Sequence, residues 1–253
     1  MYIKKNIVFA VLVALSLLLL SFIFACNDDK KDCQIPIPEV DPNDPALVPV
    51  ARDDEAWWMD RHNDRINNNV KTNQKIVFIG NSITEWWEQE ASWTALNQHY
   101  NHKITNLGYA ADQTQNVIWR LENGEFPVGI NPEYVVINIG TNNWMSGGEP
   151  ETIAAGIGKI IKIVNQNSPS SKIILMSLLP RGTGNHDERT ISNNAVNEII
   201  KQYDGCLGIQ YLDLAQYYVN NNGSLKHELF TDALHLSSAG YEIWKEKIMK
   251  IIK

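Results

Sequence analysis

The chain has 253 residues, of which 44% are hydrophobic and 20% charged, an ordinary composition for a globular protein. This length suits one large domain or two small ones, and one domain is the simpler interpretation. The formal net charge is −7 at pH 7, so the chain lacks the basic surface that nucleic-acid binding requires. We therefore expect no nucleic acid as a partner.

The first residues have the features of a secretory signal. Two lysines precede an uncharged run over residues 7–25, which ends on a small residue directly before Cys26. Residues 23–26 read IFAC and resemble a lipobox, in which the cysteine is acylated and becomes the new N-terminus. An uncleaved membrane anchor is the alternative, because the run approaches the roughly 20 apolar residues of a spanning helix. We expect a lipoprotein signal peptide over residues 1–25 and an extracytoplasmic domain that is anchored to the membrane by lipid on Cys26.

Residues 26–50 combine an acidic stretch with several prolines. Such a composition cannot bury a core, so we predict an extended tether. The acidic stretch resembles signals that send lipoproteins to the cell surface in some Gram-negative bacteria, and a solvated linker explains it equally well. Cys33 lies in this tether and Cys206 in the domain, and the sequence leaves open whether they form a disulfide.

Five short apolar runs then alternate with longer segments whose apolar residues recur at helical spacing. Three of the runs are rich in Val and Ile, as in strands that are buried on both faces. The last helical segment starts with serines, which are preferred helix N-caps. The five runs are residues 75–79, 104–107, 134–139, 172–177 and 209–212.

This alternation predicts an α/β fold for residues 51–253. Because right-handed crossovers leave few other topologies, we expect a doubly wound (flavodoxin-like) three-layer sandwich with a five-stranded parallel sheet. Ligands of such sheets bind outside the carboxyl ends of the strands. The residues that directly follow the strands are therefore the first candidates for a site.

Polar residues and glycines stand at these strand ends. Ser82 follows the first run, Gly108 follows the second, and residues 140–143 (GTNN) follow the third. In isolation, Ser82 is better explained as a helix N-cap than as a nucleophile. A nucleophilic serine needs a base, however, and near the end of the chain His235 follows Asp232 by three residues. We therefore predict a catalytic triad in which His235 is the base and Asp232 orients it.

These blocks, in this order, resemble those of the SGNH (GDSL-like) hydrolase family, and in particular its platelet-activating-factor acetylhydrolase subunit-like branch. The resemblance implies a carboxylic ester hydrolase, a serine esterase that forms an acyl-enzyme on Ser82. It also implies an oxyanion hole made of the backbone N–H groups of Ser82 and Gly108 and the side-chain amide of Asn142. The resemblance is carried by GNSIT (80–84), QTQNVIWRLENGE (113–125), IGTNN (139–143), LLPRG (178–182) and DALHLSSAGY (232–241).

Three positions depart from the usual pattern. Asn81 and Asn143 stand where the family commonly has Asp, and Tyr109-Ala110-Ala111 stands where close relatives have a pair of glycines. None of these changes touches the predicted triad. The size of the acyl pocket, however, cannot be carried over from relatives.

Four residues near the blocks are candidates for the substrate pocket: Trp86, Tyr109, Trp144 and Arg181. Packing in the core is the expected role of at least two of the aromatic residues, and a solvated loop is the better explanation of Arg181. No histidine has the spacing of a metal site, so we expect no metal and no cofactor.

The sequence therefore predicts an esterase for a small acylated substrate. The resemblance favours short acyl groups, acetyl above all, and the predicted location favours acetylated glycans, with a lipid ester such as a lysophospholipid left open. An acyltransferase with the same triad is one alternative, and a non-catalytic, glycan-binding surface lipoprotein is another. Close relatives can pair, which leaves a dimer open.

Overall fold

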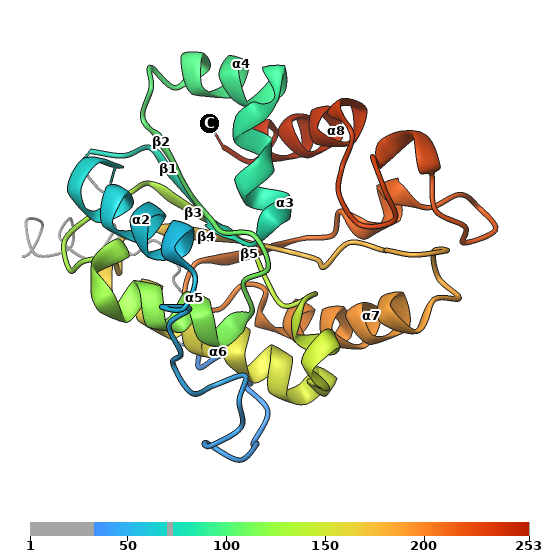
Figure 1. The fold of residues 1–253 in the computed structure, drawn as a ribbon, viewed down its shortest axis with the longest axis horizontal. Coiled ribbons are helices and arrows are strands. Elements are labelled where there is room, and N and C mark those ends of the chain that lie inside the picture. Colours follow the sequence, from blue (N-terminus) through green and yellow to red (C-terminus); the bar gives the residue numbers. More distant parts are fainter. Residues whose placement is uncertain (1–32, 70–72, 253) are drawn as a thin grey trace, which may run out of the picture.

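A computed structural model describes residues 33–69 and 73–252 (Figure 1). Five parallel strands form one sheet in the order β2-β1-β3-β4-β5. Each strand agrees with a predicted run to within one residue at either end, so the five-stranded parallel sheet is confirmed. The strands are β1 (Ile76–Gly80), β2 (Ile104–Gly108), β3 (Tyr134–Asn138), β4 (Lys172–Met176) and β5 (Ile209–Leu212).

The central strands are buried on both faces, as their composition predicts. Along β1, Val77 and Ile79 belong to one hydrophobic cluster, whereas Ile76 and Phe78 belong to the other. Successive side chains of a strand point to opposite faces, so a run without polar residues requires cover on both sides.

Helices provide this cover in two layers (Figure 1). The layer formed by α3, α4 and α8 covers one face, and the layer formed by α5, α6 and α7 covers the other. The predicted three-layer α/β sandwich is thus confirmed. The helices are α2 (Ala56–Asp64), α3 (Ser82–Glu85), α4 (Ala91–His99), α5 (Thr114–Arg120), α6 (Pro150–Asn167), α7 (Glu188–Ile200) and α8 (Ser238–Met249).

Short helical turns of other types join these elements. Two have π geometry, Arg65–Asn69 after α2 and Leu121–Glu125 after α5. The 3₁₀ turns are Trp86–Gln89, Asn143–Ser146, Lys201–Tyr203, Ala215–Tyr218 and His227–Leu229. Among the residues that the structure describes, none of the helices is both long and apolar enough to cross a membrane.

Residues 33–50 pack against the domain, which corrects the predicted tether for this part of the segment. Ile35 and Ala46 are buried, and the Thr114 hydroxyl donates to the carbonyl of Ala46 at 2.8 Å. Cys33 forms a disulfide with Cys206. Proline and acidic residues prevent a regular element, but they do not prevent a few apolar side chains from docking. The signal peptide, Cys26 and the rest of the predicted tether lie outside the described residues.

Candidate functional site

Ser82 is the first residue of α3, directly after β1. The residue that caps this helix is Asn81, whose Oδ1 accepts a hydrogen bond from the Ile83 N–H at 3.0 Å. The Ser82 side chain is therefore free of the capping role that its position suggested. Its Oγ lies 3.0 Å from Nε2 of His235. Within the described residues no acceptor contacts the Ser82 backbone N–H, which lies at the helix N-terminus.

The turn before Ser82 depends on Gly80. A Cβ atom at this position would lie 2.7 Å from the backbone oxygen of Asn138 and still closer to the Thr84 side chain. Only glycine lets β1 run into α3 at this separation from β3, and this requirement explains the Gly-Asn-Ser sequence at the strand end.

His235 and Asp232 lie in a tight loop that holds both side chains in place. Nδ1 of His235 is 2.7 Å from Oδ2 of Asp232. Oδ1 of Asp232 accepts the backbone N–H groups of Leu234 and His235, each at 2.7 Å. Burial raises the pKa of Asp232, but these hydrogen bonds outweigh it and hold that pKa below its ordinary value. An ionised Asp232 accepts a hydrogen bond from the Nδ1–H of His235, which leaves the Nε2 lone pair directed toward Ser82.

The loop after β2 provides polar groups beside Ser82, but in a different arrangement from the one predicted. The Gly108 N–H donates to Oδ1 of Asn106 at 2.7 Å, so it is not free to donate a hydrogen bond to an oxyanion. Gly108 is needed for packing instead, because a Cβ there would lie 2.4 Å from the backbone nitrogen of Glu85 in α3. Three residues later, Ala111 is exposed, and among the described residues nothing accepts its N–H.

Ala111 has a φ of 62°, in the left-handed region that favours glycine. It lies in the Tyr109-Ala110-Ala111 segment, one of the three positions at which the sequence departs from the usual pattern of the family.

Asn142 approaches from the loop after β3 and is buried. Its Nδ2 donates one hydrogen bond to the backbone carbonyl of Asp112, at 3.0 Å. The second hydrogen on this nitrogen is available to another acceptor. This hydrogen bond places the Asn142 side chain beside the loop after β2.

A buried ionic network holds the loop after β2 in place. The carboxylate of Asp112 accepts hydrogen bonds from Trp58 Nε1 at 2.7 Å, Arg120 Nε at 2.9 Å and Arg52 Nη1 at 3.2 Å. Arg120 also pairs with Glu125, and all three charged side chains of this pairing, Asp112, Arg120 and Glu125, are fully buried. Charges at such depth are stable only when each has partners, so the network holds the loop in one conformation.

Tyr109 belongs to this network, which corrects its predicted place in the substrate pocket. Its side chain is fully buried, its hydroxyl contacts Glu125, and its ring lies 3.8 Å from the guanidinium carbon of Arg120. Sequence reasoning missed these partners because Arg120 and Glu125 lie in the following helical segment.

Comparison with known proteins gives the family. Residues 78–243 match the model of the GDSL-like Lipase/Acylhydrolase family. The chain belongs to this family. It is 33% identical over 201 residues to the bovine platelet-activating factor acetylhydrolase IB subunit alpha1, covering 78% of this chain and 84% of the relative. The rat alpha2 subunit is 32% identical over 204 residues, covering 79% and 86%.

Solved structures share the fold of this GDSL-like acylhydrolase. A putative acylhydrolase from Bacteroides fragilis aligns with a TM-score of 0.61 at 22% identity, covering 78% of this chain and 97% of that one. An acetyl xylan esterase aligns with a TM-score of 0.58 at 19% identity, covering 70% and 99%. The family and the fold predicted from the sequence are thus confirmed.

The other three residues predicted for the substrate pocket lie in three different environments. Trp86 is 38% exposed, and its ring centroid lies 3.9 Å from that of His235. Trp144 is half-buried and lines a hollow of about 440 Å³ between α6 and α7. Arg181 is buried, and its Nη1 donates to the Thr141 carbonyl at 3.2 Å, next to Asn142. Arg181 therefore contacts the loop after β3 and does not face solvent, unlike the residue of a solvated loop that the sequence predicted.

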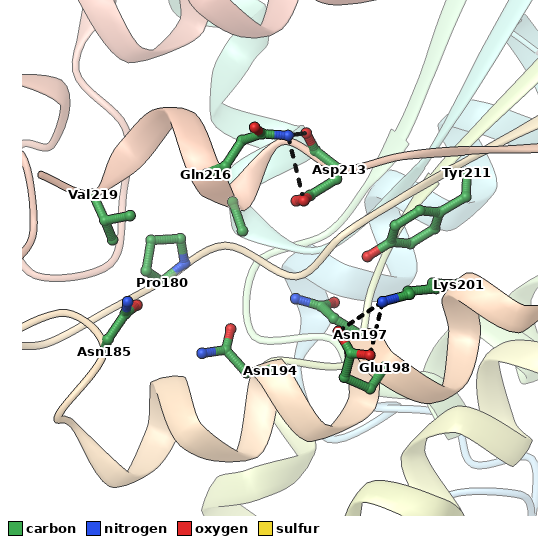
Figure 2. Close-up of a pocket in the computed structure, with 11 residues that line it drawn as sticks. Pro180, Asn185, Asn194, Asn197, Glu198, Lys201, Tyr211, Asp213, Gln216 and Val219 are labelled. Carbon is green, nitrogen blue, oxygen red and sulfur yellow. Dashed lines mark hydrogen bonds and ion pairs between the residues drawn. The ribbon is translucent and has the colours of Figure 1, made fainter. Parts of the chain in front are cut away.

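A separate cavity of about 400 Å³ lies between α7 and the segment that follows β5 (Figure 2). Its lining includes Asn194, Tyr211 and Asp213, together with the ion pair of Glu198 and Lys201. Neither the predicted nucleophile nor its two partners lines this cavity. In the part of the chain that the structure describes, no group of three or more His, Cys, Asp or Glu side chains could hold a metal ion.

Proposed function

We propose that this GDSL-like acylhydrolase is a serine esterase that removes short acyl groups, acetyl above all, through an acyl-enzyme on Ser82. The observation that carries the proposal is the continuous chain of hydrogen bonds from Ser82 Oγ to His235 Nε2, at 3.0 Å, and from His235 Nδ1 to Asp232 Oδ2, at 2.7 Å. A neutral hydroxyl becomes an effective nucleophile when such a base lies within hydrogen-bond reach.

In the first half of the reaction, Nε2 of His235 takes the hydroxyl proton while Oγ of Ser82 attacks the ester carbonyl. Asp232 stabilises the imidazolium that forms. When the tetrahedral intermediate collapses, His235 passes the proton to the departing alcohol, and the acyl group stays on Ser82. A water molecule, deprotonated by His235, then attacks the acyl-enzyme. As the bond between Oγ of Ser82 and the acyl carbon breaks, His235 returns the proton to Oγ and the carboxylic acid leaves.

The intermediate carries a negative oxygen that needs fixed donors. We assign this role to the free N–H groups of Ser82 and Ala111 and to the second hydrogen on Asn142 Nδ2. Removal of one donor from a comparable site costs about 2.7–4 kcal/mol of transition-state stabilisation. Ala111 takes the place of Gly108, whose N–H is already engaged with Asn106.

The preferred acyl group and alcohol are inferred from relatives and location. The subunits to which this chain is about one third identical are named as acetylhydrolases, which supports an acetyl ester. An acetyl xylan esterase shares the fold, so acetylated glycans are the first alcohol class to test.

We also propose that the protein works outside the cytoplasm, anchored by lipid on Cys26. The disulfide between Cys33 and Cys206 supports this location, because disulfides persist mainly in oxidising compartments. Metabolic labelling with a radioactive fatty acid tests it: label should enter the wild type and be absent from Cys26→Ser.

The esterase itself is tested with p-nitrophenyl esters of increasing acyl length. The protein should lack residues 1–26 but keep residues 33–50, which pack on the domain. We expect the highest kcat/KM on acetate, and loss of activity in Ser82→Ala but not in the control Ser146→Ala. Equal rates for wild type and Ser82→Ala would exclude the esterase and favour a glycan-binding protein. Acyl transfer to an added sugar in place of water would identify the acyltransferase.

A further inference from the structure

Trp86 is the aromatic side chain that touches the proposed catalytic base. It starts the 3₁₀ turn after α3, four residues after Ser82. Its ring centroid lies 3.9 Å from that of His235, and the two ring planes are inclined by 32°. The indole therefore covers one face of the imidazole.

Among the described residues, Trp86 belongs to neither of the two hydrophobic core clusters. The next residue, Trp87, is fully buried and packs on Trp93 and Trp244 in the core, whereas Trp86 remains 38% exposed. His235 covers part of the indole, and the exposed part faces solvent next to the proposed catalytic base. A large apolar surface in such a place is a typical binding surface.

The chemistry proposed above determines which half of the ester meets this surface. The alcohol oxygen must come within hydrogen-bond reach of His235 Nε2 to receive its proton. Because the indole lies directly against the imidazole, whatever is bonded to that oxygen passes close to Trp86. The acyl group lies on the other side of the scissile bond, near the oxyanion donors.

The charges around Trp86 favour a neutral alcohol. Its acidic neighbours in sequence, Glu85 and Glu88, both pair with Arg61, and Glu88 also pairs with Arg65 at 2.8 Å. The carboxylate of Asp232 is engaged with His235. These groups therefore offer no uncompensated charge that would attract a charged phospholipid headgroup. A sugar ring, in contrast, offers C–H groups that pack on an indole face.

We propose that Trp86 is a specificity-determining residue that binds the alcohol half of the substrate, a neutral sugar ring stacked on the indole. This inference rests on the proposed esterase function and names its substrate class.

Two substrates with the same acyl group test it, an acetylated xylo-oligosaccharide and ethyl acetate. In Trp86→Leu, we expect KM for the sugar ester to rise roughly tenfold, and kcat/KM for the sugar ester to fall by a much larger factor than kcat/KM for ethyl acetate. Trp86→Phe should fall between the wild type and Trp86→Leu. Trp57→Leu is the matched control, because Trp57 is similarly exposed, at 41%, but contacts Arg52 and Glu55 instead of His235.

Two results would overturn the proposal. A lower kcat on both substrates with unchanged KM would show that Trp86 only holds the His235 ring. Equal kinetics of Trp86→Leu and wild type on the sugar ester would show that the indole does not bind the sugar.

A binding measurement distinguishes failure of the esterase function from failure of the role proposed for Trp86. Calorimetric binding of the same oligosaccharide to Ser82→Ala should weaken roughly tenfold when Trp86→Leu is added. If the wild type hydrolyses no ester, and Trp86→Leu still weakens binding of the oligosaccharide, the binding role of Trp86 stands and the esterase function is excluded.

Discussion

The side-chain amide of Asn142 donates to the backbone carbonyl of Asp112, with 3.0 Å between Nδ2 and O, and this bond joins the loops after β3 and β2. It fixes the direction of the remaining hydrogen on Nδ2. Since this hydrogen is assigned to the oxyanion, we expect Asn142→Ala to lower kcat by roughly 10²–10³-fold with little change in KM. Steady-state kinetics on p-nitrophenyl acetate measure this effect. Asn194→Ala, in the separate cavity of Figure 2, is the control, and an Asn142→Ala rate near wild type would remove Asn142 from the oxyanion hole.

Replacement of Asp232 by Asn tests the orientation of His235. An amide can present its N–H where the carboxylate accepted one, which favours the wrong imidazole tautomer. We expect Asp232→Asn to reduce kcat by about 10⁴-fold. Because the Asp232 side chain is 54% exposed, the free energy of unfolding should change little. A loss of activity below about tenfold would mean that the loop backbone alone orients His235.

The Arg120 guanidinium has no access to solvent and pairs with both Asp112 and Glu125. Arg120→Met would leave two buried carboxylates without their main partner, so we expect the free energy of unfolding to fall by about 3–5 kcal/mol. Urea unfolding measures the change. Lys201→Met, which breaks the exposed pair with Glu198, should cost at most about 1 kcal/mol. Similar effects of the two substitutions would argue against a cooperative buried network.

Asp187 caps the N-terminus of α7, and the ionisation of its carboxyl group makes the stability of the folded protein depend on pH. Hydrogen bonds from Arg189 lower the pKa of Asp187 to about 2. In the unfolded chain this pKa is about 3.9, so the carboxylate stabilises the folded state fully above about pH 4, and this contribution is lost as pH falls toward 2.

Asp187→Asn keeps a good cap but has no charge to lose. We expect the wild type to be more stable than this variant at pH 6, with the difference shrinking between pH 4 and pH 2.5 in urea unfolding. A difference that stays constant over this range would show that the ion pair with Arg189 contributes nothing to stability.

The strands and the proposed triad were predictable because their signals are local or carried by whole sequence blocks. Runs such as residues 134–139 are rich in Val and Ile, as in strands that are buried on both faces, and Asp232 precedes His235 in a tight loop. The docking of residues 33–50 was not predictable, because it depends on contacts with distant segments, such as that of Cys33 with Cys206. Composition describes a segment alone and contains no information about such partners.

The loop after β2 shows the same limit at the level of single groups. Whether Gly108 has a free N–H depends on the rotamer of Asn106, and the buried Tyr109 ring packs on Arg120 from the following helix. The contact between Trp86 and His235 joins residues from opposite ends of the domain. Such pairings arise only when the sheet has assembled.

The disulfide between Cys33 and Cys206 determines how the protein would stand on a membrane. Cys206 precedes β5, at the amino ends of the strands, whereas Ser82 follows the carboxyl end of β1. With lipid on Cys26, as proposed, six residues lie between the acylated cysteine and this fixed point, which makes seven Cα–Cα steps. An extended chain of that length spans at most about 25 Å. The edge that carries the nucleophile would then point away from the bilayer, toward polymers that arrive from the surroundings and not toward the lipids of its own membrane.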